Sequence, residues 1–525
     1  MTTRREVIAA GLAAGALPLL AGRGLAAGIE LGPATPFSFD DLKATARSLA
    51  AEPYAPPVVA EAERLESIDY DLHNQISYRE EATLWGDVPG AAKVRFFHPG
   101  RFFKEPVEIS VVEDGTAREI LFTTELFDMP AGHPARQLTG AGFAGFRVMD
   151  PDAENDWMAV LGASYWRTSG YSGQFGLSTR GLAIDAGGPG PEEFPRFSRF
   201  WLERGGGGGI VIYALLESPR ATGAYRIASS REPGRGVFQD VDFSLNLRGD
   251  VERLGIAPLT SMFWYGKNNR WVGPDWRPEI HDSDGLEMAL GSGERIWRPL
   301  NNPPRIMANS FRADGLRGFG LAQRERSFDE YQDDGVFYEK RATLWVEPQG
   351  DWGAGSVMLV ELTTNDEIHD NIVAFWNPAA PAAAGSAYEL GYKLSWVEDS
   401  PAQTVARFTA TRIGSGGIPG QPRPPNRVRF VCDLDGRGLG GLDRSSGVEA
   451  MVEASRGVLD LVVAYPVATT DRWRVSFDLD IGPPDPADAP IDLRMYLSHE
   501  GRAMSETWLY QAFPSQLHAL LAQHP

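Results

Sequence analysis

From residue 68 onward, the chain alternates apolar and polar residues over short stretches that turn residues separate. Clear examples are KVRFFHPG, VEISVVEDG, GIVIYALLES, GAYRIASS and GVFQDVDFSLNL. Alternation with a period of two is typical of half-buried strands, and closely spaced turns indicate an antiparallel sandwich or barrel. The same pattern assigns residues 68–79, IDYDLHNQISYR, to a strand. We therefore expect an all-β protein in which residues 28–400 form a large antiparallel β-sandwich domain.

One amphipathic helix is expected before these strands. In the stretch FSFDDLKATARSLAAEPY, Phe39, Leu42, Ala46 and Leu49 recur at the spacing that places them on one face of a helix. Pro53 follows and is expected to end the helix, because a proline ring restricts the residue before it to extended backbone.

The composition changes near residue 401. Residues 401–425 include GSGGIPGQPRPP, and this density of Gly and Pro predicts a linker. Residues 426–525 return to short alternating stretches, such as VRFVCDLD and WRVSFDLD. Several short strands over about 100 residues are typical of an immunoglobulin-like sandwich, so we expect a smaller second domain of this kind.

The N-terminus has the pattern of an export signal. Arg4 and Arg5 precede a weakly apolar stretch, and Gly24-Leu25-Ala26 supplies the small residues that a signal peptidase reads. The apolar stretch contains Gly and Pro and is too short to span a membrane. Residues 1–26 are therefore interpreted as a twin-arginine signal peptide that directs the protein to the periplasm. The alternative is a disordered N-terminal tail.

Charge and cysteine content restrict the partners and the chemistry. The formal net charge is −20, which disfavours a nucleic acid or an anionic membrane as partner and favours a neutral substrate. The single cysteine, Cys432, allows neither an intramolecular disulfide nor a cysteine metal cluster. The glycine run 205–209 lacks the Lys-Ser/Thr of a phosphate loop. No motif indicates a cofactor.

Two acidic stretches that also contain aromatic residues are the candidates for chemistry. They are WVGPDWRPEIHDSDGLEM, residues 271–288, and TNDEIHDNIVAFWNP, residues 364–378. Aromatic rings pack against sugar C–H faces, and two carboxyl groups can cleave a glycosidic bond by acid and base catalysis. The alternative is a pair of solvated loops. The run 282–285 resembles a calcium loop but lacks its later ligands, and His281 and His369 lack zinc spacing, so no metal is expected.

Four motifs in this order carry a family resemblance: SMFWYG, DWRPEIHDSDGL, WRPLNNP and DEIHDNIVAFW. They closely resemble the OpgG/OpgD family, also called MdoG/MdoD, of periplasmic glucan biosynthesis proteins. The twin-arginine signal makes the chain more similar to the OpgD branch. The resemblance implies a large sandwich similar to galactose-mutarotase-like domains and an immunoglobulin-like domain. It also implies work on osmoregulated periplasmic glucans with a β-1,2-linked backbone, as an inverting endo-β-1,2-glucanase-type glycoside hydrolase.

Carried over by these motifs, Asp370 matches the general acid of the family, Asp282 the general base, and Glu367 a supporting acid. The substrate-binding residues that we expect are Tyr338, Trp271, Trp276, Arg277 and Trp376. Inversion requires room for water, so the carboxyl groups of Asp370 and Asp282 should lie about 6.5–9.5 Å apart or more. Repulsion from Asp366 and Glu367 is expected to raise the pKa of Asp370.

Two other functions stay open at this point. Some relatives transfer the cut chain to a sugar hydroxyl, which would make the protein a transglycosylase forming cyclic or branched glucan. A scaffold without catalysis would hold the glucan and present it to the membrane glucan synthase. Intact Asp282 and Asp370 favour the enzyme, because a pure binding protein has no need of paired acids. Whether the protein is a monomer or a homodimer is not indicated.

Overall fold

The computed structural model describes residues 28–401, 405–468 and 470–523. The signal peptide expected at residues 1–26 lies outside the described residues. Within the described part of the chain, no helix combines the length and the apolar character that crossing a membrane requires.

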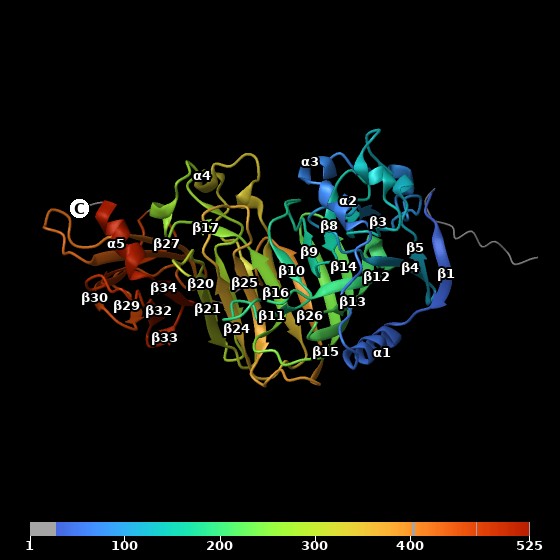
Figure 1. Cartoon of the computed structure of the whole chain (residues 1–525). Coiled ribbons are helices and arrows are strands. Elements are labelled where there is room, and N and C mark those ends of the chain that lie inside the picture. Colours follow the sequence, from blue (N-terminus) through green and yellow to red (C-terminus); the bar gives the residue numbers. More distant parts are fainter. Residues whose placement is uncertain (1–27, 402–404, 469, 524–525) are drawn as a thin grey trace, which may run out of the picture.

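Two large sheets contain most of the described strands (Figure 1). The larger sheet has sixteen described strands, in the order β1 (Leu31–Pro36), β5 (Thr116–Ile120), β4 (Glu108–Glu113), β12 (Arg196–Arg204), β13 (Ile210–Glu217), β14 (Ala221–Glu232), β15 (Gly236–Leu247), β26 (Ala387–Val397), β23 (Thr343–Gln349), β22 (Gly318–Ala322), β19 (Gly285–Ala289), β20 (Arg295–Pro299), β34 (Thr507–Ala512), β32 (Ile491–His499) and β29 (Val448–Ala454), with β33 (Arg502–Ala503) beside β32. Its ladders are antiparallel except for the pairs β4–β12 and β20–β34.

The smaller of the two has ten described strands and is antiparallel throughout. Their order is β21 (Met307–Arg312), β24 (Gly355–Glu361), β25 (Ile372–Pro378), β16 (Leu254–Ser261), β10 (Ser178–Arg180), β9 (Tyr165–Thr168), β8 (Asp156–Leu161), β7 (Gly145–Met149) and β3 (Lys93–Phe97), with β11 (Ala183–Ile184) beside β16. Two short pairs accompany these sheets: β17 (Phe263–Tyr265) with β18 (Ile280–His281), and β2 (Ser77–Tyr78) with β6 (Phe127–Asp128).

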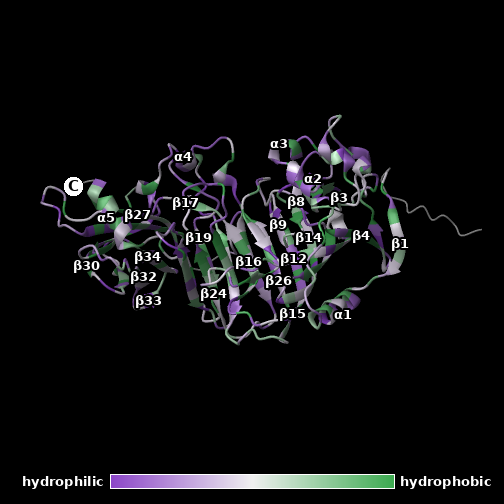
Figure 2. Cartoon of the chain, in the orientation of Figure 1, coloured by the Kyte–Doolittle hydropathy of each residue, from purple (hydrophilic) through white to green (hydrophobic). Residues whose placement is uncertain are grey.

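The two large sheets pack face to face around an apolar core. Phe146 of β7 makes an edge contact with Phe200 of β12 at 5.3 Å, and Trp166 of β9 lies 6.2 Å from Phe197 of β12. Hydrophobic and hydrophilic residues alternate along many of these strands (Figure 2), as expected for strands with one buried face. The predicted all-β sandwich is thereby confirmed. Its expected likeness to mutarotase-type and immunoglobulin-like domains stays a prediction.

The predicted N-terminal helix is present as α1, Phe39–Ala50. The Ser38 hydroxyl caps it by accepting a hydrogen bond from the Asp41 amide at 3.1 Å. Leu42 and Ala46 are buried against β13 and β14, so the apolar face that the sequence predicted covers the larger sheet. The other described α-helices are α2 (Ala62–Ser67), α3 (Tyr70–His73), α4 (Phe328–Tyr331) and α5 (Pro514–Gln523).

The strand expected at residues 68–79 is wrong for most of its length. Residues Tyr70–His73 form α3 instead, and only Ser77–Tyr78 is a strand. The Asp69 carboxylate accepts a hydrogen bond from the Leu72 amide at 3.1 Å. This cap stabilises a helical turn where the alternation of side chains alone indicated extended backbone.

The linker expected at residues 401–425 is also partly wrong, because it contains strand β27, Arg407–Ser415. This strand pairs with β28 (Arg427–Asp435), and a four-stranded sheet continues through β31 (Trp473–Asp480) to β30 (Val458–Pro466). Phe408 of β27 is buried in a second apolar core, formed mainly by residues of the C-terminal strands. The Gly and Pro residues that suggested a linker belong mainly to the connection after Ser415.

The C-terminal unit, which begins at β27, is joined to the large sandwich by a shared sheet and by one buried ion cluster. Arg324 donates to both oxygens of Glu506, at 2.6 and 3.1 Å, and to Glu287 at 3.1 Å. Its guanidinium lies 3.6 Å above the Trp297 ring and also donates to the Phe408 carbonyl. All three charged side chains are buried, so the cation is required to neutralise two carboxylates away from water.

We expect the substitution Arg324→Leu to lower the free energy of unfolding by about 3–5 kcal/mol, because it leaves two carboxylates in a buried site without their cation. Thermal denaturation followed by circular dichroism measures the effect. The matched control Arg312→Leu removes an exposed arginine paired with Asp314 and should change stability by less than about 1 kcal/mol. Equal melting temperatures for both variants would contradict the assigned role of Arg324.

Candidate active site

Asp370 lies on the loop that connects β24 to β25, close to the C-terminal end of β16, which pairs with β25. The Thr260 hydroxyl donates to Asp370 Oδ2 at 3.3 Å, and the Tyr165 hydroxyl of β9 donates to the same oxygen at 3.5 Å. The neighbouring Trp166 is buried in the core, and side chains alternate between the two faces of a strand. Tyr165 therefore faces outward, and Asp370 stands on the outer face of the smaller sheet.

The backbone around Asp370 is held by the buried side chain of the next residue. The Asn371 carboxamide accepts from the Phe263 amide at 2.8 Å and donates to the Phe263 carbonyl at 3.0 Å. The same amide group also donates to the Leu362 carbonyl at the other end of the loop, at 2.9 Å. Three hydrogen bonds from one buried side chain thus fix both ends of the loop that carries Asp370.

The pKa of Asp370 is raised, as predicted, but the expected cause is wrong. The carboxyl reaches solvent on one side, yet the surrounding protein atoms remove much of its hydration, and this desolvation raises its pKa. The hydrogen bond from Thr260 and the positive charges of Arg180 and Arg167 act in the opposite direction. Repulsion from Asp366 and Glu367 is not among the main causes.

Asp282 directly follows β18 and is buried. Its burial raises the pKa of the carboxyl to about 6; the Arg341 charge opposes this rise and the Asp370 charge adds to it. Arg341 Nε lies 2.7 Å from Asp282 Oδ1 in an ion pair. Gly176 leaves the space for this pair, because a Cβ there would lie 2.6 Å from the Arg341 side chain.

One short backbone segment connects the two candidate acids. The Asp282 amide donates to the Met262 carbonyl at 2.8 Å, while Asn371, next to Asp370, binds both backbone groups of Phe263. Phe263 also pairs with His281 in the β17–β18 ladder. The two acids are therefore brought together although 88 residues separate them in the chain. Their expected carboxyl separation stays a prediction.

Glu367 and Tyr338, two of the predicted site residues, are in contact. The Tyr338 hydroxyl donates to Glu367 Oε2 at 2.5 Å, and Arg277 donates to both Glu367 oxygens at 2.9 Å. The Arg277 guanidinium also donates to Asp275 and Asp333, so carboxylates take up its donor groups. Arg277 therefore orients Glu367 and does not present a free cation to a substrate.

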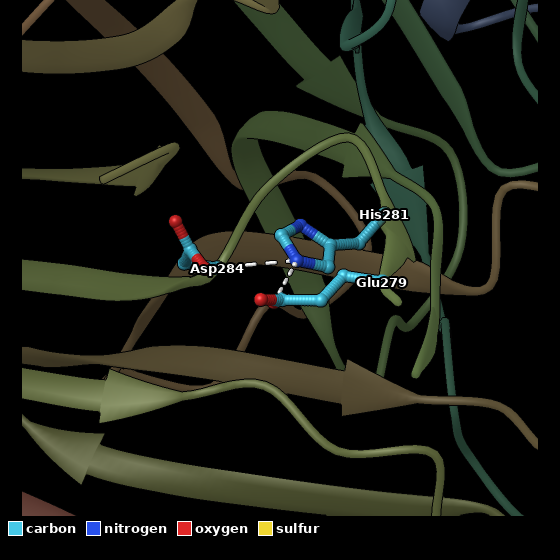
Figure 3. A group of neighbouring side chains, drawn as sticks. All are labelled: Glu279, His281 and Asp284. Atoms are coloured by element: carbon cyan, nitrogen blue, oxygen red, sulfur yellow. Dashed lines mark hydrogen bonds and ion pairs between the residues drawn. The ribbon is translucent and has the colours of Figure 1, made fainter. Parts of the chain in front are cut away.

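Glu279, His281 and Asp284 lie close enough together to form a candidate metal ligand set (Figure 3). The Lys267 ammonium, however, lies 2.9 Å from Glu279. His281 is buried, which lowers its pKa, but the Asp284 and Glu279 charges outweigh this effect and raise it overall. Asp284 Oδ2 accepts from the amides of residues 324 and 325. The ligand atoms of this group are thus engaged in ion pairs and hydrogen bonds, and His281 directly precedes Asp282 in the chain.

The three predicted tryptophans are not brought together at the carboxylates. Trp376 is 1% exposed and packs against Trp352 at 5.2 Å, so it belongs to the core and cannot stack on a sugar. Trp271 packs against the core of the C-terminal unit. Trp276 is 72% exposed and stands between Asp275 and Arg277, which places it at the rim of the Glu367 network.

Sequence reasoning missed five residues that surround the two acids: Tyr165, Arg167, Arg180, Thr260 and Arg341. The stretch LGASYWR contains two of them, and it alternates like any strand of this chain. The sequence signal for these residues is a polar side chain at the outward position of a strand whose other face is buried. It is weak, because outward polar residues are common in a sandwich.

Comparison with known proteins identifies the family of the chain. The family described as "Periplasmic glucan biosynthesis protein, MdoG" matches residues 37–512. The chain is 46% identical to glucans biosynthesis protein D 2 of Ralstonia nicotianae, over 98% of both chains. It is also 46% identical to glucans biosynthesis protein D of Stenotrophomonas maltophilia, over 92% of this chain and 91% of the relative.

Among solved structures, a polysaccharide lyase is matched over 71% of this chain and 44% of its own, with 10% identity and a TM-score of 0.19, and this likeness supports no argument. The relatives named glucans biosynthesis protein D confirm the expected likeness to the OpgD branch. Identity at this level over nearly the whole chain establishes common descent with these proteins. The chain belongs to the MdoG family of periplasmic glucan biosynthesis proteins.

Proposed function

We propose that the protein is an inverting, endo-acting glycoside hydrolase that cleaves the β-1,2-linked backbone of periplasmic glucan. The observation that carries this proposal is the pair Asp282 and Asp370. Both carboxyl groups have a raised pKa and they interact electrostatically. Hydrogen bonds of the Asp282 amide and of the Asn371 side chain, next to Asp370, anchor both to one segment. Paired acids with shifted pKa values are what glycosidic cleavage requires. The linkage itself is inferred from the family motifs.

The two environments support different roles for the two acids. Asp370 lies at the solvent-facing surface, and desolvation by the surrounding protein raises its pKa, which favours the protonated form that can donate to the leaving glycosidic oxygen. Asp282 is paired with Arg341, which favours its ionised form. In the proposed step, Asp370 protonates the glycosidic oxygen as its bond to the anomeric carbon breaks. Asp282 takes a proton from a water that attacks that carbon from the opposite face.

Glu367 has a supporting role in this proposal. Its two oxygens already accept from Arg277 and Tyr338, so it shapes and charges the site and does not transfer the proton. Residues Arg4 and Arg5 support export through the twin-arginine route, in agreement with the periplasmic description of the family. The membrane glucan synthase is the partner that this place in glucan biosynthesis suggests.

The variant Asp370→Asn should lose about 10²–10⁴-fold in cleavage rate while still binding glucan, because an amide cannot donate the required proton. Linear β-1,2-glucan is incubated with the mature protein and followed by product mass and reducing ends. The exposed Asp334→Asn provides a control with a similar chemical change and native activity. New masses without new reducing ends would replace hydrolysis by transglycosylation, and bound glucan without any product would favour the scaffold.

The pH profile of kcat/KM should be bell-shaped, since Asp282 must be ionised and Asp370 protonated. Activity should rise as the pH increases through about 6, where Asp282 loses its proton. Arg341→Met removes the cation that favours ionised Asp282, so this limb should move to higher pH by about 1–3 pH units. Arg341→Lys keeps the charge and should move it less. An unmoved limb in Arg341→Met would contradict the assignment of the base.

A further inference from the structure

Strand β30 of the C-terminal unit exposes a run of apolar side chains to solvent. Four large side chains of this strand are exposed: Val458 (65%), Leu461 (39%), Val462 (40%) and Val463 (48%). Leu459 and Ala464 of the same strand pack instead against the core of the C-terminal unit. Removing apolar surface from water is favourable, so neighbouring apolar side chains that stay exposed indicate an interaction surface.

The same strand forms an open edge of its sheet. Among the described strands β30 pairs only with β31, and it is the last strand of the four-stranded sheet. A bulge between Asp460 and Val463 places Leu461 and Val462 opposite a single residue of β31. Such a bulge interrupts the ladder locally and leaves the extra residue unpaired. The edge of β30 therefore offers apolar side chains together with backbone hydrogen-bonding groups.

The other edge strands of the three larger sheets carry the residues that normally block an open edge. Proteins protect such edges with charged side chains or proline, because an open edge can pair with another chain. These residues are Glu449 and Glu453 in β29, Lys93 and Arg95 in β3, Arg312 in β21, Arg407 and Arg412 in β27, and Pro33 and Pro36 in β1. The only charged residue of β30 is Asp460, and Arg427 pairs with it at 2.9 Å. The bulge alone protects this edge, and a partner is expected to cover it.

Charge favours a second copy of this chain as the partner. Residues 405–525 contain twelve arginines, no lysine and fourteen acidic residues, whereas the whole chain contains 50 basic and 70 acidic residues. The C-terminal unit is thus nearly neutral, and two copies can approach there without the repulsion that the rest of this acidic chain causes. A strand that packs antiparallel on its own copy also meets an equally apolar strand, because the same residues face each other across a two-fold axis.

We propose that the protein forms a homodimer in which the β30 strands of two copies pack antiparallel across a two-fold axis, through the exposed side chains of residues 458–463. Strand β30 lies at one end of the molecule, opposite α1 and β1, whereas β16 and β25, which position the candidate active site, lie in the middle (Figure 1). The contact therefore joins two chains at their C-terminal units and leaves both candidate active sites open. It does not depend on the proposed function, because no residue of β30 belongs to the candidate active site.

The test measures the mass of the full mature chain by analytical ultracentrifugation at protein concentrations from about 1 to about 100 µM. We expect a dimer that dissociates on dilution. Val462 lies in the middle of β30, so its two copies come close to each other at the two-fold axis. Val462→Asp and Val462→Lys should each raise the dissociation constant of the dimer roughly tenfold or more, because like charges then face each other. An equimolar mixture of these two variants should restore the dimer, because opposite charges then meet.

Two further variants make the outcome decisive. Val458→Asp changes a side chain that is 65% exposed, so it should fold normally and also weaken the dimer. Leu121→Asp is the matched control, because Leu121 is 37% exposed, directly follows β5 at the opposite end of the molecule and should leave the dimer unchanged. A native chain that stays monomeric at about 100 µM overturns the proposal. A dimer that persists in both Val458→Asp and Val462→Asp, or that Leu121→Asp weakens equally, also overturns it.

Discussion

The backbone of Met262 and Phe263 is the constraint on which the candidate active site depends. The Met262 carbonyl accepts a hydrogen bond from the Asp282 amide, and both backbone groups of Phe263 bind the carboxamide of Asn371, next to Asp370. Backbone hydrogen bonds have a fixed direction and are costly to leave unmade when buried. Strand β16 leads directly into this segment and pairs with β25. The positions of the two acids are therefore fixed by the strands of the sandwich.

The carboxylates near the candidate active site differ in whether a positively charged side chain forms an ion pair with them. Lys267 pairs with Glu279, Arg277 with Glu367 and Arg341 with Asp282. Asp370 differs from these, because its hydrogen bonds come from the neutral hydroxyl groups of Thr260 and Tyr165. Its two nearby arginines act through space and do not compensate for its desolvation. The site therefore separates Asp370, which accepts hydrogen bonds from neutral hydroxyl groups, from carboxylates that each form an ion pair with a lysine or arginine.

The C-terminal unit is physically linked to this site. Arg324 holds Glu506 of the C-terminal strands with its side chain and donates its backbone amide to Asp284. Asp284 in turn faces His281, the residue before Asp282 (Figure 3). A short chain of contacts thus runs from the interface of the two units to a candidate acid. The shared sheet through β20 and β34 adds a second connection, so the two units support one site.

Local patterns in the sequence were sufficient for the all-β class, for helix α1 and for the motifs that contain Asp282, Glu367 and Asp370. Alternation, helical periodicity and motifs are properties of neighbouring residues. They failed at α3, where a side-chain cap prevailed over alternation. Only the tertiary structure decided that Trp376 is core, and that Tyr165 and Thr260 reach Asp370. Those contacts join strands far apart in the chain, and which strands become neighbours depends on the packing of the whole sandwich.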